Sequence, residues 1–396
     1  MTLAFVTPSF YPAYVYGGPT VANYALCKTL AAQGAHISVV TTDANGKTGL
    51  QVEKNRPVTL SPGLSVTYFR EQLRNRFSRR FIQGARLAIR DADAVHIQSV
   101  FSVYTVLALR FAKKYGKPVL LSPNGSLGLW SMRQGSRFKK AFVRLFIEPY
   151  LSGVVFHASS AREAEEIKAL LPEAVCTVIA NGVDLDAFNS NEKPARAAYL
   201  ERFARNTGIR NAEVAVALCR LHKVKGLDIL IRSVHMLRQN GRNVVLLIAG
   251  PDSGEKENLQ RLTSELALQD AVFFTGELGG ADKTAFLGGA DVFALPSFHE
   301  NFGIAYLEAL AAGIPVVASR QTPWQEVETA GCGRWVDNTP EDFAEAIHSL
   351  LETGNAAVAD KARAFASRFS WDNMARQFME AYRGGIPVPK TTTKTI

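Results

Sequence analysis

Short apolar runs alternate with longer amphipathic segments along most of this 396-residue chain. Each short run has the length of a buried strand, and each longer segment repeats its apolar positions at helical spacing. This alternation predicts βα units, with parallel sheets that carry helices on both faces. The expected strands are Leu3–Thr7, Ile37–Thr41, Ser65–Phe69, Ala94–Ile97, Pro118–Leu121, Val154–His157 and Cys176–Ile179 in the first half, and Val214–Leu218, Val244–Ile248, Val272–Thr275, Val292–Leu295, Pro315–Ala318 and Gly333–Val336 in the second.

The alternation starts again beyond Asn181–Phe188, where a polar stretch follows. We therefore expect two doubly wound, Rossmann-like α/β domains of ordinary size, 1–187 and 188–366. Sheets of this kind bind ligands beyond the carboxyl ends of their strands. The two domains are accordingly expected to face each other across a ligand-binding cleft. The tail, 384–396, has the composition of a disordered segment.

The composition is that of a soluble globular protein, with 47% apolar and 20% charged residues. No apolar run in the sequence reaches the roughly 18 residues that span a bilayer. The N-terminal segment has neither the basic region nor the cleavage site of a signal peptide. The cysteines are far apart and form no C-x-x-C pair, which predicts reduced thiols. A cytoplasmic location is expected.

The net charge of +9 is spread unevenly. One basic run holds Arg70, Arg74, Arg76, Arg79, Arg80, Arg86 and Arg90, and a second holds Arg133, Arg137, Lys139, Lys140 and Arg144. The runs Arg70–Arg90 and Arg133–Arg144 are either solvated faces or a patch for anionic groups. Those groups would be lipid headgroups on the inner face of the cell membrane or a phosphorylated acceptor. No nucleic-acid-binding motif accompanies the charge, so no nucleic-acid partner is expected.

The segment Ala290–Ser319 holds several candidate functional residues close together. A strand that ends at Leu295 leads through a loop, which carries Glu300, into a helix that carries Glu308. The start of that helix is expected to present the amides of Phe302, Gly303 and Ile304. Unpaired amides at a helix start attract anions, and carboxylates bind sugar hydroxyls. The pattern therefore suits a sugar phosphate.

Two further strand ends carry candidate phosphate-binding groups. Arg220 and Lys225 follow the first strand of the second domain and precede a helix near Leu227. Arginine clamps phosphate through a planar fork and lysine adds a point charge, although two surface cations would give the same pattern. In the first domain Gly17 and Gly18 lie between a strand and a helix, where paired glycines allow a tight turn with amides aimed at a ligand.

Together these segments resemble the retaining glycosyltransferases of the GT-B fold, known as glycosyltransferase family 4 or group 1. The spacing of Glu300 and Glu308 is similar to the family's E-x7-E signature, and Arg220 with Lys225 to its R-x4-K-G element. The resemblance implies that Glu300 holds hydroxyls of the transferred sugar and Glu308 the nucleotide ribose. It also implies that Arg220 and Lys225 hold the diphosphate of a nucleotide-sugar donor. The implied acceptor is a glycan or a polyprenyl- or lipid-linked sugar.

Shorter matches extend the resemblance over nearly the whole chain. Gly250 and Leu278 lie in segments that would border the nucleotide base. Glu326 stands where the family usually has a glutamate, and a helix-start acid is the alternative. The segment 367–383 resembles the family's terminal helix, which crosses back to the N-terminal domain.

The sequence departs from the family after Pro118–Leu121. Many relatives have a histidine there that reaches the donor sugar, whereas this chain has Asn124. An amide binds a sugar but cannot act as a charged acid, so a general-acid role does not carry over. His299, beside Glu300, is a further donor-site candidate. For His96 and His157 a hydrogen-bonded structural role fits at least as well as a functional one.

No metal and no cofactor are expected. No set of His, Cys and carboxylate residues has metal-ligand spacing, and Asp91–Asp93 is interpreted as a solvated pair, not as a D-x-D metal motif. No carboxylate stands out as a nucleophile, so we expect front-face substitution with retention, in which cations stabilise the leaving diphosphate. By family resemblance the setting is polysaccharide or glycolipid assembly. The alternatives are another GT-B enzyme, a sugar phosphorylase or an epimerase, and a catalytically silent sugar- or lipid-binding module.

Overall fold

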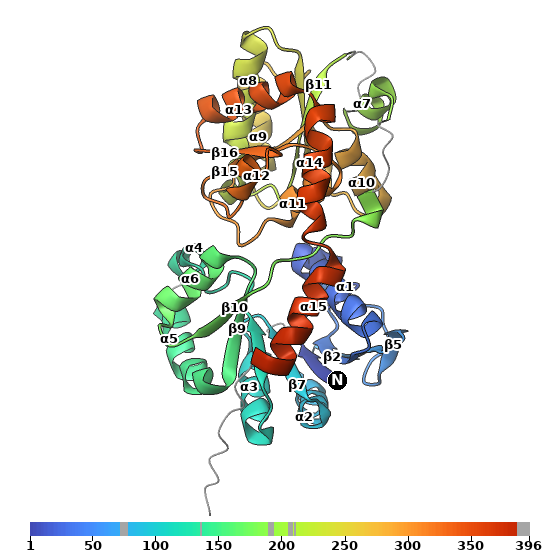
Figure 1. Cartoon of the computed structure of the whole chain (residues 1–396), viewed down its shortest axis with the longest axis vertical. Coiled ribbons are helices and arrows are strands. Elements are labelled where there is room, and N and C mark those ends of the chain that lie inside the picture. The colour runs from blue at the N-terminus through green and yellow to red at the C-terminus, as the bar shows by residue number, and fades with distance from the viewer. Residues whose placement is uncertain (72–77, 135–136, 189–193, 205–208, 210, 386–396) are drawn as a thin grey trace, which may run out of the picture. The chain divides into compact units, whose positions relative to one another are not determined.

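The computed structural model describes residues 1–71, 78–134, 137–188, 194–204, 209 and 211–385. The chain folds into two compact units (Figure 1). Unit 1 combines Met1–Gly182 with the residues from Trp371 onward, and unit 2 is Val183–Ser370. These boundaries lie a few residues from the expected ones at 187/188 and 366/367. The expected tail lies, from residue 386, outside the described residues.

Unit 1 is built on a sheet with the strand order β10-β9-β8-β7-β1-β2-β6-β5. Neighbouring strands are parallel except β5 and β6. The chain winds from β1 toward β5 and then from β7 toward β10, so the winding direction reverses between β1 and β7. The strands are β1 Thr2–Val6, β2 His36–Thr42, β5 Val58–Ser61, β6 Leu64–Phe69, β7 Ala94–Gln98, β8 Val119–Ser122, β9 Val154–Ala158 and β10 Val175–Val178, with a small hairpin of β3 Ala44–Asn45 and β4 Thr48–Gly49.

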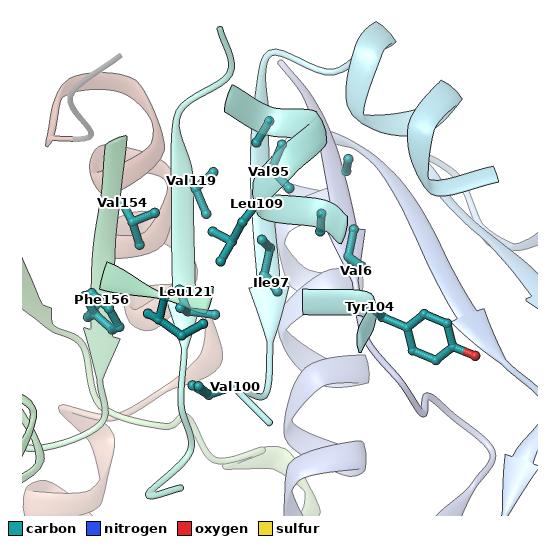
Figure 2. Close-up of a cluster of buried hydrophobic side chains, with 14 of the residues drawn as sticks. Val6, Val95, Ile97, Val100, Tyr104, Leu109, Val119, Leu121, Val154 and Phe156 are labelled. Carbon is teal, nitrogen blue, oxygen red and sulfur yellow. The ribbon is translucent and has the colours of Figure 1, made fainter. Parts of the chain in front are cut away.

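Helices cover both faces of this sheet. They are η1 Tyr14–Tyr16, α1 Gly18–Ala32, α2 Arg79–Asp91, α3 Val103–Tyr115, α4 Leu129–Gln134, α5 Arg137–Phe146, η2 Glu148–Gly153 and α6 Ala161–Leu170, joined by the C-terminal α15 Trp371–Glu380 and the π-helical turn η5 Ala381–Gly385. Figure 2 shows one apolar layer, in which Val6, Ile97 and Leu121 of three neighbouring strands pack with Leu109 of α3. The other layer includes Phe378 of α15.

Unit 2 is a parallel sheet with the strand order β13-β12-β11-β14-β15-β16. Its strands are β11 Glu213–Leu218, β12 Val244–Ala249, β13 Val272–Gly276, β14 Val292–Leu295, β15 Val316–Ser319 and β16 Gly333–Val336. Its helices are η3 Asp186–Phe188, α7 Arg196–Ala204, η4 Lys223–Lys225, α8 Leu227–Gln239, α9 Lys256–Glu265, α10 Gly280–Gly288, α11 Ile304–Ala311, α12 Glu326–Thr329, α13 Pro340–Thr353 and α14 Asn355–Ser367. The winding direction reverses between β11 and β14, which are adjacent. Both units are therefore doubly wound, Rossmann-like α/β domains.

The chain passes between the units twice, and the two passages run beside each other. In unit 2 the Val183 amide donates to the Phe369 carbonyl at 2.8 Å, and Val183 bridges to Ser370. In unit 1 Gly182 lies against the indole of Trp371, where an added Cβ would stand 2.5 Å from the ring. The ends of unit 2 therefore meet. Over the described residues, no helix is long and apolar enough to cross a membrane.

Candidate functional site

The winding reversal of unit 2 brings two expected segments together. Lys225 ends η4, which follows β11, and Glu300 lies in the loop that follows β14. Because these strands are adjacent and parallel, their carboxyl ends share one edge of the sheet. The amide of Phe298 donates to the Val224 carbonyl at 2.8 Å, which fastens the loop to η4.

Lys225 and Glu300 form a sheltered ion pair at this edge. The Lys225 Nζ atom lies 2.5 Å from Glu300 Oε1, and each side chain is only 13% exposed. The Ser297 hydroxyl donates to the same carboxylate oxygen at 2.9 Å. The carboxylate is thus fixed through one oxygen by a cation and a hydroxyl. A carboxylate has a second oxygen that can also accept hydrogen bonds.

The thiol of Cys219 is within electrostatic reach of Arg220, Lys225 and Glu300, the residues expected to hold the diphosphate and the transferred sugar. Burial raises the pKa of this thiol to about 12, while the cations of Lys225 and Arg220 act to lower it and the Glu300 carboxylate acts to raise it. Arg220 itself is exposed. The charges of Arg220, Lys225 and Glu300 thus all act on the thiol of Cys219, and Lys225 and Glu300 are in direct contact.

At this edge of the sheet, two glycines allow the backbone to lie against the carbonyl oxygen of another residue. A Cβ on Gly226 would lie 2.3 Å from the Pro296 carbonyl oxygen, and one on Gly250 would lie 1.8 Å from the Cys219 carbonyl oxygen. Both also have positive φ, 63° and 145°. The structure thus gives Gly250 a packing role. Its expected contact with a nucleotide base stays a prediction.

The expected start of the helix after Glu300 is wrong by two residues. Gly303 adopts φ 88° as the N-cap, so α11 begins at Ile304. Phe302 is buried, and its carbonyl accepts the indole N–H of Trp324. The amides of Ile304 and its successors therefore form the helix start, because the left-handed Gly303 separates Phe302 from the helix.

Two buried polar atoms near this loop lack a protein partner. The Oδ1 atoms of Asn301 and Asn338 are buried and have no hydrogen-bond partner among the residues that the structure describes. Asn338 also donates through Nδ2 to the Pro296 carbonyl at 2.9 Å. Because buried acceptors are rarely left unpaired, the two oxygens suit hydroxyl donors of a ligand. Asn338 was not among the expected site residues.

The other expected donor-site residues of unit 2 differ in exposure and in the partners that they contact. Glu308 is 14% exposed and pairs with Lys283 of α10, a partner that was not anticipated. Leu278 and His299 are half-buried. Glu326 is exposed and forms an ion pair with Arg368 at 2.9 Å, which is consistent with the alternative of a surface acid at a helix start.

In unit 1 the expected residues also follow strands. Gly17 is the N-cap of α1, at φ 70°, and Gly18 is its first residue. Asn124 follows β8 at φ 50°, and its side-chain amide lies 2.6 Å from that of Gln98. His96 and His157 are buried and hydrogen-bonded to the Ser122 hydroxyl, at 2.7 and 2.8 Å, which is consistent with a structural role for both.

A cavity of about 1110 Å³ opens beyond the carboxyl ends of β2 and β6. It is lined by the cationic residues Lys47, Lys54, Arg70 and Arg80, with the acidic Asp43 and Glu71. Lys54 pairs with the buried Asp43 at 3.0 Å. The expected Arg70–Arg90 run thus contributes to a basic cavity, although its Arg74 and Arg76 lie outside the described residues.

Both aspartates of the expected solvated pair Asp91–Asp93 are exposed, and each contacts another residue of unit 1. Asp91 pairs with Arg90 at 2.7 Å, and Asp93 accepts the Thr2 amide at 2.7 Å. Over the residues that the structure describes, no group of three or more His, Cys, Asp or Glu side chains is placed to hold a metal ion.

The chain matches two family models that together span most of its length. The model for Glycosyltransferase Family 4 matches residues 16–187, and that for Glycosyl transferases group 1 matches residues 199–387. The sucrose-phosphate synthase from Thermosynechococcus elongatus shares the fold, with a TM-score of 0.74, 18% identity and coverage of 97% of this chain and 98% of that one.

Curated relatives include a D-inositol 3-phosphate glycosyltransferase of Corynebacterium urealyticum, 32% identical over 55% of this chain and 53% of its own length. A GDP-mannose-dependent alpha-(1-6)-phosphatidylinositol monomannoside mannosyltransferase of Mycolicibacterium smegmatis is 35% identical over 52% of this chain and 55% of its own length. The chain spans about half the length of these relatives. On both family models and the fold, the chain belongs to the group 1, family 4 glycosyltransferases of the GT-B fold.

Proposed function

We propose that this protein is a retaining glycosyltransferase that moves a hexosyl group from a UDP- or GDP-sugar to a glycan or lipid-linked acceptor. The observation that carries the proposal is the ion pair of Lys225 and Glu300 at the winding reversal of unit 2, with Arg220 just beyond the end of β11. The two cations suit a diphosphate, and the fixed carboxylate suits the hydroxyls of the attached hexose. Asn301 and Asn338 add acceptors for further hydroxyls.

In the proposed reaction the bond between the anomeric carbon and the diphosphate oxygen breaks first. Arg220 and Lys225 stabilise the negative charge that develops on the leaving diphosphate. The acceptor hydroxyl attacks the face that the diphosphate leaves, and its proton passes to a phosphate oxygen. The new bond therefore keeps the anomeric configuration. The residues of the site supply this charge stabilisation without a metal or cofactor in the proposed scheme.

The test is calorimetric titration of the purified protein with UDP, GDP, ADP and their sugars, followed by turnover of the sugar nucleotide that binds. The anomeric configuration of the product, read by proton NMR, decides between retention and inversion. A product of inverted configuration would contradict the front-face scheme. Transfer to inorganic phosphate would indicate a phosphorylase, and release of an epimeric sugar nucleotide an epimerase. Binding without any turnover would indicate a silent binding module.

For the acceptor, we propose a molecule that carries an anionic group. Support comes from the basic cavity beyond β2 and β6 in unit 1, where Arg70 and Arg80 line the wall together with Lys47. The C. urealyticum relative is named for a phosphorylated acceptor, inositol 3-phosphate. Competition of acceptor binding by inorganic phosphate is expected to disappear in Arg80→Gln. Equal competition in both proteins would contradict the cavity assignment.

A second proposal concerns an anionic membrane surface and is carried by α5. One face of this helix packs Val143 into the core, while Phe138, Leu145 and Phe146 are 84%, 63% and 42% exposed. The exposed Lys140 and Arg144 lie on the same short helix. Exposed aromatic and basic side chains together suit anionic headgroups. The α2 run contributes less, because Arg86 and Arg90 contact Tyr115 and Asp91.

Sedimentation with liposomes tests this surface. The protein is expected to bind vesicles of anionic phospholipid and not vesicles of phosphatidylcholine, and Lys140→Glu is expected to abolish the difference. Equal partitioning with both kinds of vesicle would remove the electrostatic case.

A further inference from the structure

The segment between β1 and α1 gathers tyrosine side chains in unit 1. Tyr11, Tyr14 and Tyr16 lie in this segment, and Tyr24 follows on α1. The rings of Tyr11 and Tyr24 stack, with 4.1 Å between their centroids and an angle of 15° between their planes. The ring of Tyr14 stands edge-on to that of Tyr11, at 5.6 Å and 90°. We refer to Tyr11, Tyr14 and Tyr24 as the tyrosine patch.

The ring of Tyr14 is exposed and yet held in place. Tyr11 and Tyr24 are half-buried and pack against the core of unit 1, whereas Tyr14 is 53% exposed. The amide of Tyr14 donates to the Pro12 carbonyl at 2.8 Å, and its own carbonyl accepts the Gly17 amide at 2.8 Å. A tyrosine that is fixed in this way offers a large contact area at a low cost in conformational entropy. Exposed aromatic groups of this kind are typical of binding surfaces.

The phenol groups of the patch are neutral. Burial raises the pKa of Tyr14 and Tyr24 above the usual value of about 10, and the neighbouring Tyr11 raises both further. A neutral phenol donates one hydrogen bond and also accepts. The patch therefore combines flat apolar ring faces with hydroxyl groups that exchange hydrogen bonds with a ligand.

This combination suits the ring of a saccharide. One face of a sugar ring carries mainly C–H groups, which pack against an aromatic face, and the hydroxyl groups at its edge pair with phenols. The surface of α5 differs, because its exposed Phe138, Leu145 and Phe146 carry no hydroxyl group. The tyrosine patch thus fits a polyhydroxylated ring better than the acyl chain of a lipid.

The basic cavity of unit 1 adjoins the segment that carries the patch. The amide of Gly46, in the turn of the β3–β4 hairpin, donates to the Tyr16 hydroxyl at 3.1 Å. A Cβ on Gly46 would lie 3.6 Å from the side chain of Val15. Gly46 and the next residue, Lys47, also line the cavity. One hairpin turn therefore contacts both the tyrosine segment and the cavity that suits an anionic group.

We propose that the tyrosine patch binds the sugar ring of the acceptor, while the adjoining cavity takes the anionic group of the same molecule. Tyr14 contacts the ring, and Tyr11 and Tyr24 support Tyr14 from behind. All the residues of this site belong to unit 1. That the bound sugar is an acceptor rests on the proposed function, whereas the binding of an anionic sugar does not.

Binding is tested with the full-length protein by saturation-transfer NMR and by calorimetry. The probes are the methyl glycosides and the 6-phosphates of glucose, mannose and galactose, together with inorganic phosphate. At least one of the sugar phosphates is expected to receive saturation on its ring C–H protons and to bind more tightly than its methyl glycoside. The absence of saturation on every sugar would overturn the proposal.

The variant Tyr14→Ala removes the exposed ring and is expected to lower the affinity for the bound sugar phosphate about tenfold. Tyr14→Phe keeps the ring and should lose less. The affinity for inorganic phosphate should not change in either variant, because the cavity is intact. Tyr115→Ala, at a half-buried tyrosine on α3, is the matched control and should bind the sugar phosphate as the parental protein does.

Unchanged affinity of Tyr14→Ala for the sugar phosphate would show that the sugar binds elsewhere and would overturn the site. So would an equal loss in Tyr14→Ala and Tyr115→Ala. A loss of binding to phospholipid vesicles in Tyr14→Ala, with sugar binding retained, would identify a lipid as the occupant and would also overturn it.

Kinetics separates the site from the proposed function. In turnover with a sugar nucleotide and an acceptor, Tyr14→Ala should raise the KM for the acceptor more than it lowers kcat, and should leave the KM for the sugar nucleotide unchanged. A raised KM for the sugar nucleotide alone would contradict the acceptor assignment. If a sugar phosphate binds at Tyr14 but no sugar nucleotide is turned over, the proposed function fails and the sugar site stands.

Discussion

At the scale of single residues, Lys225 and Glu300 neutralise each other and hold each other in place. Each side chain satisfies the other in a setting where both are 13% exposed. An ion pair that is sheltered in this way gives little net stability, because the loss of hydration offsets the attraction. Its value is geometric, since it holds a cation and a carboxylate at fixed positions beside Arg220 and Cys219.

We predict that Lys225→Ala lowers kcat about 10²- to 10³-fold, because one preorganised charge at the leaving group is lost. Lys223→Ala is the matched control, since Lys223 lies on the same 3₁₀ helix but is 80% exposed. The control is expected to stay within about twofold of the parental rate, as measured by steady-state release of nucleotide. Comparable losses in both variants would contradict the assignment of Lys225.

His96 and His157 predict a pH dependence of stability. Burial lowers the pKa of both below the usual histidine value of about 6.5. The unfolded chain therefore binds protons that the folded chain does not, so stability is retained above pH 6.5 and is lost as the pH falls below it. The slope is at most about 1.4 kcal/mol per pH unit for each histidine.

Urea unfolding between pH 8 and pH 5 measures this slope. His96→Gln is expected to reduce it, whereas His36→Gln, at an exposed histidine, is not. An unchanged slope in His96→Gln would show that His96 is not the group responsible.

At the scale of elements, the close crossing of η4 with the loop after β14 depends on Gly226. A Cβ there would meet the Pro296 carbonyl oxygen at 2.3 Å. We predict that Gly226→Ala destabilises unit 2 by about 1–3 kcal/mol more than Gly241→Ala does. Gly241 also has positive φ, but a Cβ on it would meet nothing within 4 Å, so the difference isolates the clash. Calorimetric unfolding measures it, and equal effects would contradict the crowding.

The elements that the sequence predicted well are those whose pattern is local. Val244–Ala249 is wholly apolar and wholly buried, so its strand follows from composition alone. The edge strand Val58–Ser61 was missed because its side chains are half-exposed and lack an apolar run. The start of α11 was misplaced because the conformation of Gly303 depends on contacts with Tyr306 and Trp324, which local spacing does not reveal.

The residues of the candidate site likewise include some that local motifs predicted and some that they missed. Arg220, Lys225 and Glu300 were found from motifs that lie after strands, where doubly wound sheets place ligands. Lys283, the partner of Glu308, was missed because it comes from α10, a separate helix. The contact of Tyr382 with His96 was missed for the same reason, because only the folded structure brings the two ends of the chain together.

At the scale of the whole molecule, α15 is part of the core of unit 1. Met374, Phe378, Met379 and Tyr382 are buried there. We predict that in a chain that ends at Ser370 unit 1 is unfolded at 37 °C, whereas unit 2 still shows its unfolding transition in calorimetry. The reason is that each lost side chain contributes about 1.5–3 kcal/mol to the free energy of unfolding of unit 1. A chain that ends at Gly385 is the control and should show both transitions. Survival of both transitions in the shorter chain would contradict the role of α15.

The paired passages at Val183 and Phe369 make unit 2 an insertion within unit 1. A ribosome therefore completes every residue of unit 2 before it adds the last helix of unit 1. Until that helix emerges, the nascent chain carries the whole C-terminal sheet and an N-terminal sheet with part of one apolar face uncovered. The core of the N-terminal half is therefore completed last, and a premature stop near the end damages the half that was made first.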